Sequence, residues 1–280
     1  MGDELKPKKR RKFKIILGII LLVLLISVIT LFVIVNSSKQ IEARLLVEQG
    51  NVEVNGRTAI NEEILNEGDI VETFSGLATV ILYESVVVNL DENTKITLKE
   101  LVKEHPQLEQ EYGTTWNKFT RLFGVEDYTI KSGNTLASVR GTSFEFSQNK
   151  VFTAEGKVDV TMGSKNIELL EGKIIEKVKD KVQERSANEE ELMKQKLRQE
   201  RVVKALQNLR ELEMQKHQNT VNLIKKQLDI SDEEIQIKLR EADQGRYDID
   251  KTLEQAPIKT APVQKIAEIT KTIQEANDKR

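Results

Sequence analysis

The chain has 280 residues, of which 39% are apolar and 31% charged, and its formal net charge is −2. It contains no cysteine, which excludes disulfides, thiolate metal sites and cysteine nucleophiles. With only two histidines, His105 and His217, far apart in the sequence, zinc sites and Ser-His-Asp catalysis have little support.

The N-terminus combines a basic cluster with a long apolar run. Residues 15–35 carry no charge, and as a helix rising 1.5 Å per residue they would span about 31 Å, close to the roughly 30 Å of a bilayer core. A cleaved signal peptide is the alternative, but its apolar region is shorter, at about 7–15 residues. We therefore expect a single transmembrane helix at 15–35. The topology signal consists of Lys8, Lys9, Arg10, Arg11 and Lys12.

The positive-inside rule sets the predicted orientation. The basic tail 1–14 would be cytoplasmic, and the bulk of the chain extracytoplasmic. The basic residues would also attract anionic lipid of the bilayer. The expected localisation is the cell membrane, with a single pass.

Residues 41–178 have the pattern of a mainly-β domain. Short runs such as "NVEVNG", "DIVETF" and "LATVILYE" alternate in hydrophobicity or concentrate β-branched residues. Glycines and the Asp91-Glu92-Asn93 cluster separate these runs. We expect a domain built from β-hairpins.

One segment, 102–123, departs from this pattern. Trp116, Phe119 and Phe123 lie at i, i+3 and i+7, which predicts one face of a short helix. The three aromatic side chains would either pack as a lid on the β core or form a platform for a sugar or other flat ligand.

Residues 186–280 are charged and predicted to be α-helical. Ser186 has capping-box spacing to Glu189, Ser231 to Glu234, Gly245 suits a helix end, and Pro262 suits a first turn. The apolar spacings mix threes, fours and sixes, so a strict coiled-coil seam is not established. The helices would either pack on themselves or bind a protein partner or a second copy.

No arrangement of side chains in the sequence indicates catalysis. Paired acids such as Glu62-Glu63 have no neighbouring histidine or nucleophile, and no glycine-rich phosphate loop is present. The turn beginning at Asp91 is rich in oxygen ligands but does not match an EF-hand. The acidic exterior with few aromatics speaks against nucleic acid. We expect no catalytic residue, cofactor or metal.

Five segments occur in the order typical of one known family. They read "EQGNVEVNG", "LNEGDIVETFSGLATVIL", "SVVVNLDENTKITL", "SGNTLASVRGTSFEF" and "VFTAEGKVDVT". On these motifs residues 48–161, about two fifths of the chain, resemble the FecR domain, an extracytoplasmic module. The family signature corresponds to Val139, Arg140, Gly141, Thr142 and Phe144.

Two departures limit what the resemblance implies. Tyr83-Glu84-Ser85 stands where the family often has Asp-Gly-Ser. FecR regulators also carry a folded cytoplasmic portion that engages a sigma factor, whereas only residues 1–14 precede the predicted helix here, so that role is not carried over.

The signature segment itself has a structural interpretation. In strand geometry Val139 and Gly141 would share one face, and Arg140, Thr142 and Phe144 the other. The glycine would permit a bulge or a close strand approach, and the arginine would tie neighbouring carbonyls or a carboxylate. We favour this role over ligand binding.

The sequence therefore predicts a non-enzymatic, membrane-anchored protein with an extracytoplasmic FecR-like β-domain and charged C-terminal helices. Its expected function is envelope sensing, scaffolding, or binding of a protein or glycan. The alternatives are a transmembrane signalling regulator that acts on a cytoplasmic partner, and an envelope enzyme with an unrecognised site.

Overall fold

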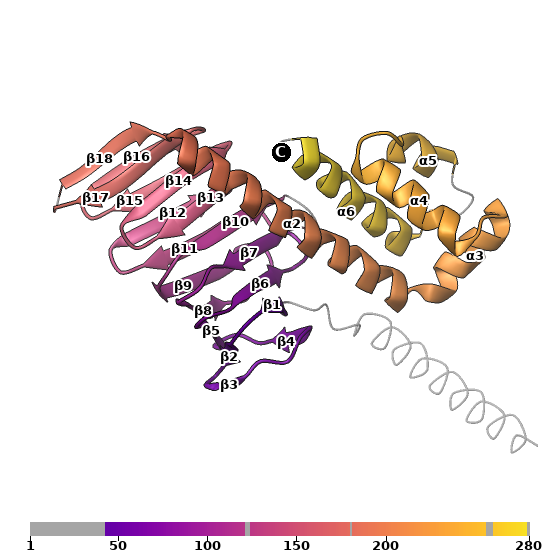
Figure 1. Ribbon diagram of the computed structural model, residues 1–280, viewed down its shortest axis with the longest axis horizontal. Coiled ribbons are helices and arrows are strands. Elements are labelled where there is room, and N and C mark those ends of the chain that lie inside the picture. Colours follow the sequence, from indigo (N-terminus) through magenta and orange to yellow (C-terminus); the bar gives the residue numbers. More distant parts are fainter. Residues whose placement is uncertain (1–42, 121–123, 180, 256–259, 279–280) are drawn as a thin grey trace, which may run out of the picture. The chain divides into compact units, whose positions relative to one another are not determined.

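The computed structural model describes residues 43–120, 124–179, 181–255 and 260–278. Strands β1–β18 come first along the chain and helices α2–α6 follow (Figure 1). The strands form two nine-stranded sheets, which we call the first and the second sheet.

The two sheets have the following strand orders. The first sheet runs β18 (Lys181–Ser186), β17 (Lys173–Val178), β14 (Lys150–Glu155), β13 (Ser143–Ser147), β10 (Thr115–Phe119), β7 (Val86–Leu90), β6 (Leu77–Leu82), β1 (Ala43–Gln49) and β4 (Glu63–Leu65). The second sheet runs β16 (Lys165–Leu170), β15 (Lys157–Met162), β12 (Thr135–Val139), β11 (Tyr128–Ser132), β9 (Gln107–Tyr112), β8 (Thr94–Glu100), β5 (Ile70–Thr73), β2 (Val52–Val54) and β3 (Arg57–Thr58). Strands β9 and β11 pair in parallel, and the other neighbours are antiparallel.

The inner faces of the two sheets enclose the main hydrophobic core. The first sheet contributes side chains such as Val88 and Phe144, and the second contributes Ile96, Ile130 and Val158. Strand β12 of the second sheet alternates buried and half-buried residues, as expected where one face meets the core and the other meets solvent.

The central strands of the first sheet are buried on both faces. All five residues of β7 and of β10 are buried, and the sequence of β7, "VVVNL", lacks polar–apolar alternation. Such a run is typical of a strand that is covered on both sides. The helices supply the second cover.

A second apolar core joins α2 (Glu189–Lys216) and α6 (Ala261–Asp278) to the outer face of the first sheet. Its helical members include Val202, Leu206 and Ile273, and its strand members include Val87 and Trp116. The C-terminal helices therefore pack on the β-domain, a question that the sequence left open.

The remaining helices are α3 (Gln218–Leu228), α4 (Asp232–Asp243) and α5 (Ile249–Gln255). The capping box at Ser231 and Glu234 is confirmed, and Gly245, at φ 68°, follows the end of α4 as predicted. The box predicted at Ser186 is wrong. Ser186 ends strand β18, and the cap of α2 is Asn188 with Glu191.

The predicted fold class, a membrane-anchored chain with a single transmembrane helix, needs correction. Within the described ranges no helix is long and apolar enough to cross a membrane. Helix α2, with 28 residues, has the length but carries charged side chains along it. Segment 15–35 and the topology signal Lys8, Lys9, Arg10, Arg11 and Lys12 lie outside the described residues. The described chain is mainly β, with two large sheets and C-terminal helices.

The helix predicted within 102–123 is also wrong. Residues 107–112 and 115–119 form strands β9 and β10, and β10 pairs with both β7 and β13. The i, i+3 spacing therefore places Trp116 and Phe119 on opposite faces of a strand. Phe123 lies outside the described residues. Pairing of β10 with strands distant in sequence therefore determines the secondary structure of residues 115–119.

Candidate functional site

The signature segment links the two sheets. Val139 ends β12 in the second sheet, Ser143 begins β13 in the first, and Gly141 has a φ of 96°. The expected strand geometry is therefore wrong for residues 140–142, which form a corner. Thr142 and Phe144 are buried, whereas Arg140 is exposed.

Trp116 and Phe119 are buried in the two different cores, with exposed fractions of 0% and 1%. The ring centroids of Trp116 and Phe152 are 6.3 Å apart. The guanidinium carbon of Arg198 lies 5.7 Å from the centroid of the Trp116 ring. Neither aromatic side chain presents a face to solvent. These two residues therefore form no platform for a glycan.

Two arginines of α2, which we call the arginine clamp (Arg198 and Arg201), hold the helix on the first sheet. Arg198 binds Glu145 and lies 2.7 Å from Asp91, while Arg201 lies 2.8 Å from Asp91 and 2.9 Å from Glu48. Both oxygens of the Asp91 carboxylate thus contact arginine. Among the described residues no cluster of acidic or histidine side chains could hold a metal ion.

A second polar contact, which we call the Glu84 link (Glu84, Lys265 and Glu213), joins the β6–β7 turn to α2 and α6. Lys265 Nζ lies 2.5 Å from Glu84 and 3.0 Å from Glu213. Burial raises the pKa of Glu84 above the ordinary value of a glutamate, and the hydrogen bond and charge of Lys265 oppose this rise.

The turn that carries Glu84 has unusual backbone geometry. Tyr83 and Glu84 adopt φ angles of 47° and 58°, in the left-handed region that favours glycine. The Tyr83 hydroxyl donates a hydrogen bond to the carbonyl of Leu101. This turn is where the sequence departs from the FecR pattern, and here it contacts the helices. Strained backbone is frequent at functional positions.

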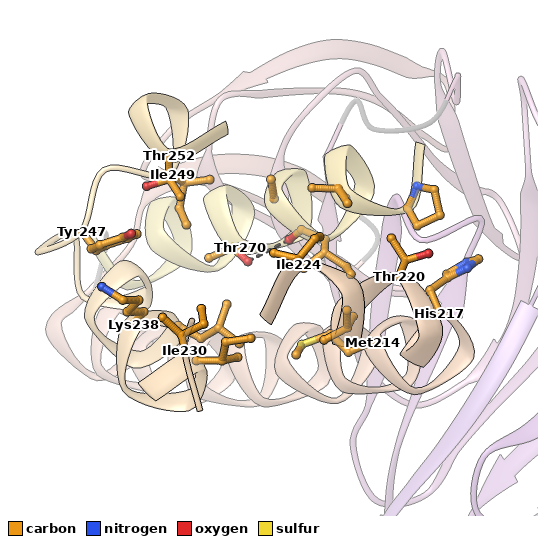
Figure 2. A pocket seen from close by; sticks show the side chains of 17 residues that line it. Met214, His217, Thr220, Ile224, Ile230, Lys238, Tyr247, Ile249, Thr252 and Thr270 are labelled. Atoms are coloured by element: carbon orange, nitrogen blue, oxygen red, sulfur yellow. Dashed lines mark hydrogen bonds between the residues drawn. The ribbon is translucent and has the colours of Figure 1, made fainter. Parts of the chain in front are cut away.

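The candidate site is an apolar pocket of about 410 Å³ among the helices (Figure 2). Helices α2 to α6 all contribute to its lining. Most of the 17 lining side chains are apolar, and the larger ones include Met214, Val221, Ile224, Ile235, Leu239 and Ile266.

Polar side chains lie at two ends of the pocket. Figure 2 shows Lys238 beside Tyr247 at one end, and His217 beside Thr220 at the other. The Lys238 ammonium lies 4.9 Å from the centroid of the Tyr247 ring. No aspartate or glutamate of the described residues lines the pocket. The ionisable lining is therefore basic or phenolic.

The pocket and the Glu84 link are direct neighbours. Met214 and Ile266 line the pocket, and each follows a member of the link, Glu213 or Lys265, in the sequence. His217 Nε2 also lies 3.7 Å from Glu213. Residues that line the pocket therefore adjoin, along α2 and α6, residues of the Glu84 link.

A smaller cleft of about 290 Å³ lies between α6 and the signature corner. Lys118 and Glu155 line it and pair at 2.6 Å, and Lys271 and Glu275 line it as well. Since its lining carries both signs of charge, it indicates no particular ligand. Sequence reasoning missed both cavities, because each is walled by several separate elements whose packing local patterns do not specify.

No family model matches the chain, and no curated protein matches it either. The FecR resemblance therefore stays a prediction.

Two crystal structures, at 1.65 and 2.50 Å resolution, are among the solved structures to which part of this chain is similar. Both are of a protein from Parabacteroides distasonis ATCC 8503 that is provisionally described as an anti-sigma factor. The TM-score is 0.39 and the identity 19%, over 44% of this chain and 62% of that protein, so the match spans less than two thirds of its length.

Proposed function

We propose that this chain is a non-enzymatic sensing module, in which the helices bind an apolar ligand and the β-domain responds to occupancy of the pocket. The observation that carries the proposal is that α2 and α6 build both the pocket and the apolar core beneath the helices. A ligand that changes how these two helices pack at one end would alter their docking at the other.

The pocket has the properties of a binding site. Its volume of about 410 Å³ falls in the range of about 300–1,000 Å³ that is typical of small-molecule sites. Side chains such as Val221, Ile224 and Leu239 remain half-exposed there although they are apolar. A ligand would remove this apolar surface from water, which stabilises the complex.

The Glu84 link provides the connection to the β-domain. Lys265 contacts carboxylates on both sides, one on α2 and one on the β6–β7 turn. If a ligand binds more tightly to one arrangement of these contacts than to another, it shifts the population toward that arrangement. Sensing also requires an output, so a signalling role with a protein partner belongs to this proposal.

The first test is binding of Nile red, a neutral apolar dye, to the full chain. Val221→Trp places a large ring in the pocket wall and should abolish binding. Leu223→Trp is the matched control, because Leu223 lies on the same helix, is 48% exposed and does not line the pocket. Absence of dye binding, or equal loss in both variants, would contradict the proposal.

Hydrogen exchange tests the response of the β-domain. With dye bound, exchange of the amides in the β6–β7 turn, at residues 83–85, should slow relative to the free protein. Unchanged exchange in this turn, with binding intact, would refute sensing and leave only a ligand site.

A further inference from the structure

We propose that the pocket takes an amphiphile, with one alkyl chain and one anionic head group that pairs with Lys238. The inference rests on the proposed function and specifies the class of ligand.

The body of the ligand is alkyl because the walls offer few polar partners. An extended peptide would bring a backbone N–H and C=O at every residue, and each buried group without a partner carries a free-energy cost. The hydroxyl of Thr270, one of the few polar groups in the wall, already donates to the carbonyl of Ile266 at 2.8 Å. An alkyl chain leaves no such group unpaired.

The head group is anionic because no carboxylate of the described residues lines the pocket, whereas Lys238 and His217 do. A cationic head would meet the like charge of Lys238 at one end of the pocket. An anion would gain a favourable charge pair in a site partly shielded from water, where such pairs are stronger than in bulk solvent.

Lys238 is the better partner of the two basic residues. His217 already lies 3.7 Å from Glu213. Among the described residues no carboxylate lies within ion-pair distance of Lys238, and Glu234, one turn earlier, is engaged in the capping box with Ser231. The ammonium rests instead on the Tyr247 ring at the end of the pocket shown in Figure 2. The head therefore lies at this end, and the chain runs toward Met214.

The experiment is calorimetric titration of the full chain with dodecanoate and with dodecanol, both below their aggregation concentrations. The two compounds share an alkyl chain and differ in charge. Dodecanoate should bind more tightly. Lys238→Met should weaken its binding about two- to fivefold, the factor expected for loss of one partly exposed charge pair, and leave dodecanol binding unchanged.

Arg240→Met is the matched control, since Arg240 is an exposed cation on the same helix that does not line the pocket. It should change neither titration. Lys238→Gln provides a second variant should the methionine disturb folding, and it should weaken dodecanoate binding to the same extent. Equal affinity for dodecanoate and dodecanol, or no effect of either Lys238 variant, would overturn the proposal.

A lysophosphatidylglycerol with the same acyl chain distinguishes the sources of such an anion. Tighter binding of dodecanoate assigns a free carboxylate, tighter binding of the lysolipid assigns a phosphate head group, and both outcomes support the shared chemistry. If Nile red binds and is blocked by Val221→Trp while charge has no effect, the inference fails and the proposed function stands. If none of these compounds binds, both fail.

Discussion

Replacing Arg201 with methionine should weaken the docking of α2 on the first sheet while keeping an apolar stem. The guanidinium contacts the carboxylates of Glu48 and Asp91, and it donates to the carbonyls of Ala78 at 3.2 Å and Leu90 at 2.8 Å. One side chain thus reaches strands β1, β6 and β7 and the residue that follows β7. Methionine cannot donate any of these hydrogen bonds.

The expected loss follows from the partners left behind. Breaking a fully buried ion pair costs about 3–5 kcal/mol. The Arg201 side chain is 14% exposed, its two carboxylate partners are each 28% exposed, and Asp91 retains Arg198, so the cost should be smaller. We expect about 2–3 kcal/mol in the free energy of unfolding. For a folded region of this size that corresponds to a fall in Tm of about 4–12 °C.

The assay combines urea unfolding with hydrogen exchange. Amide exchange should accelerate in α2 and in β7 beneath it, since weaker docking exposes both elements to water more often. Lys204→Met is the control, because Lys204 is an exposed cation on the same helix, and it should leave both measurements unchanged. Stability of the Arg201 variant equal to wild type, with unchanged exchange in α2, would refute the clamp and leave docking to apolar contacts alone.

Three further changes test other parts of the fold. The hydrogen bond from Arg185 lowers the pKa of Glu191, so the stabilisation by Glu191 is complete above about pH 4.5 and is lost as pH falls through the folded-state pKa. Glu191→Gln, which can still form a capping box, should cost about 1–3 kcal/mol at neutral pH, and acid titration of stability should show this difference shrinking. Leu206→Ala in the second core should cost about 2–5 kcal/mol, whereas Leu197→Ala, at 62% exposed on the same helix, should change the unfolding free energy by less than about 0.5 kcal/mol. Gly113→Ala would place Cβ 2.4 Å from a Cα atom of β8 and should lower stability by at least about 2 kcal/mol more than Gly163→Ala, where nothing lies within 4 Å. Equal costs within either matched pair, measured by urea unfolding, would contradict the packing described above.

Features decided within a few residues could be predicted. The Ser231 capping box, the end of α4 at Gly245 and the β character of runs such as β7 follow from local hydrogen bonding, backbone freedom and side-chain shape. The capping box predicted at Ser186 is wrong because Ser186 belongs to strand β18, and Asn188, two residues later, caps α2.

Features decided between distant segments could not. The spacing of Trp116 and Phe119 predicted a helix, but the segment forms strand β10 because it pairs with β7 and β13. The apolar residues of α2 read equally as a partner surface or an internal contact. The structure buries Leu206 and Leu209 against the chain itself, so these two are unavailable for self-association.

The sequence by itself determined that the chain is β-rich and then helical, lacks cysteine chemistry, and carries its turns and caps at particular residues, because composition and local backbone preferences act over a few positions. Only the tertiary structure decided that the helices cover the first sheet, that Arg201 reaches β1, β6 and β7, and that an apolar pocket opens beside the Glu84 link. The contacts of Arg201 and the Glu84 link bring together groups separated by more than a hundred residues. The free energy of all these features depends on burial and charge pairing that exist only after the sheets and helices have packed.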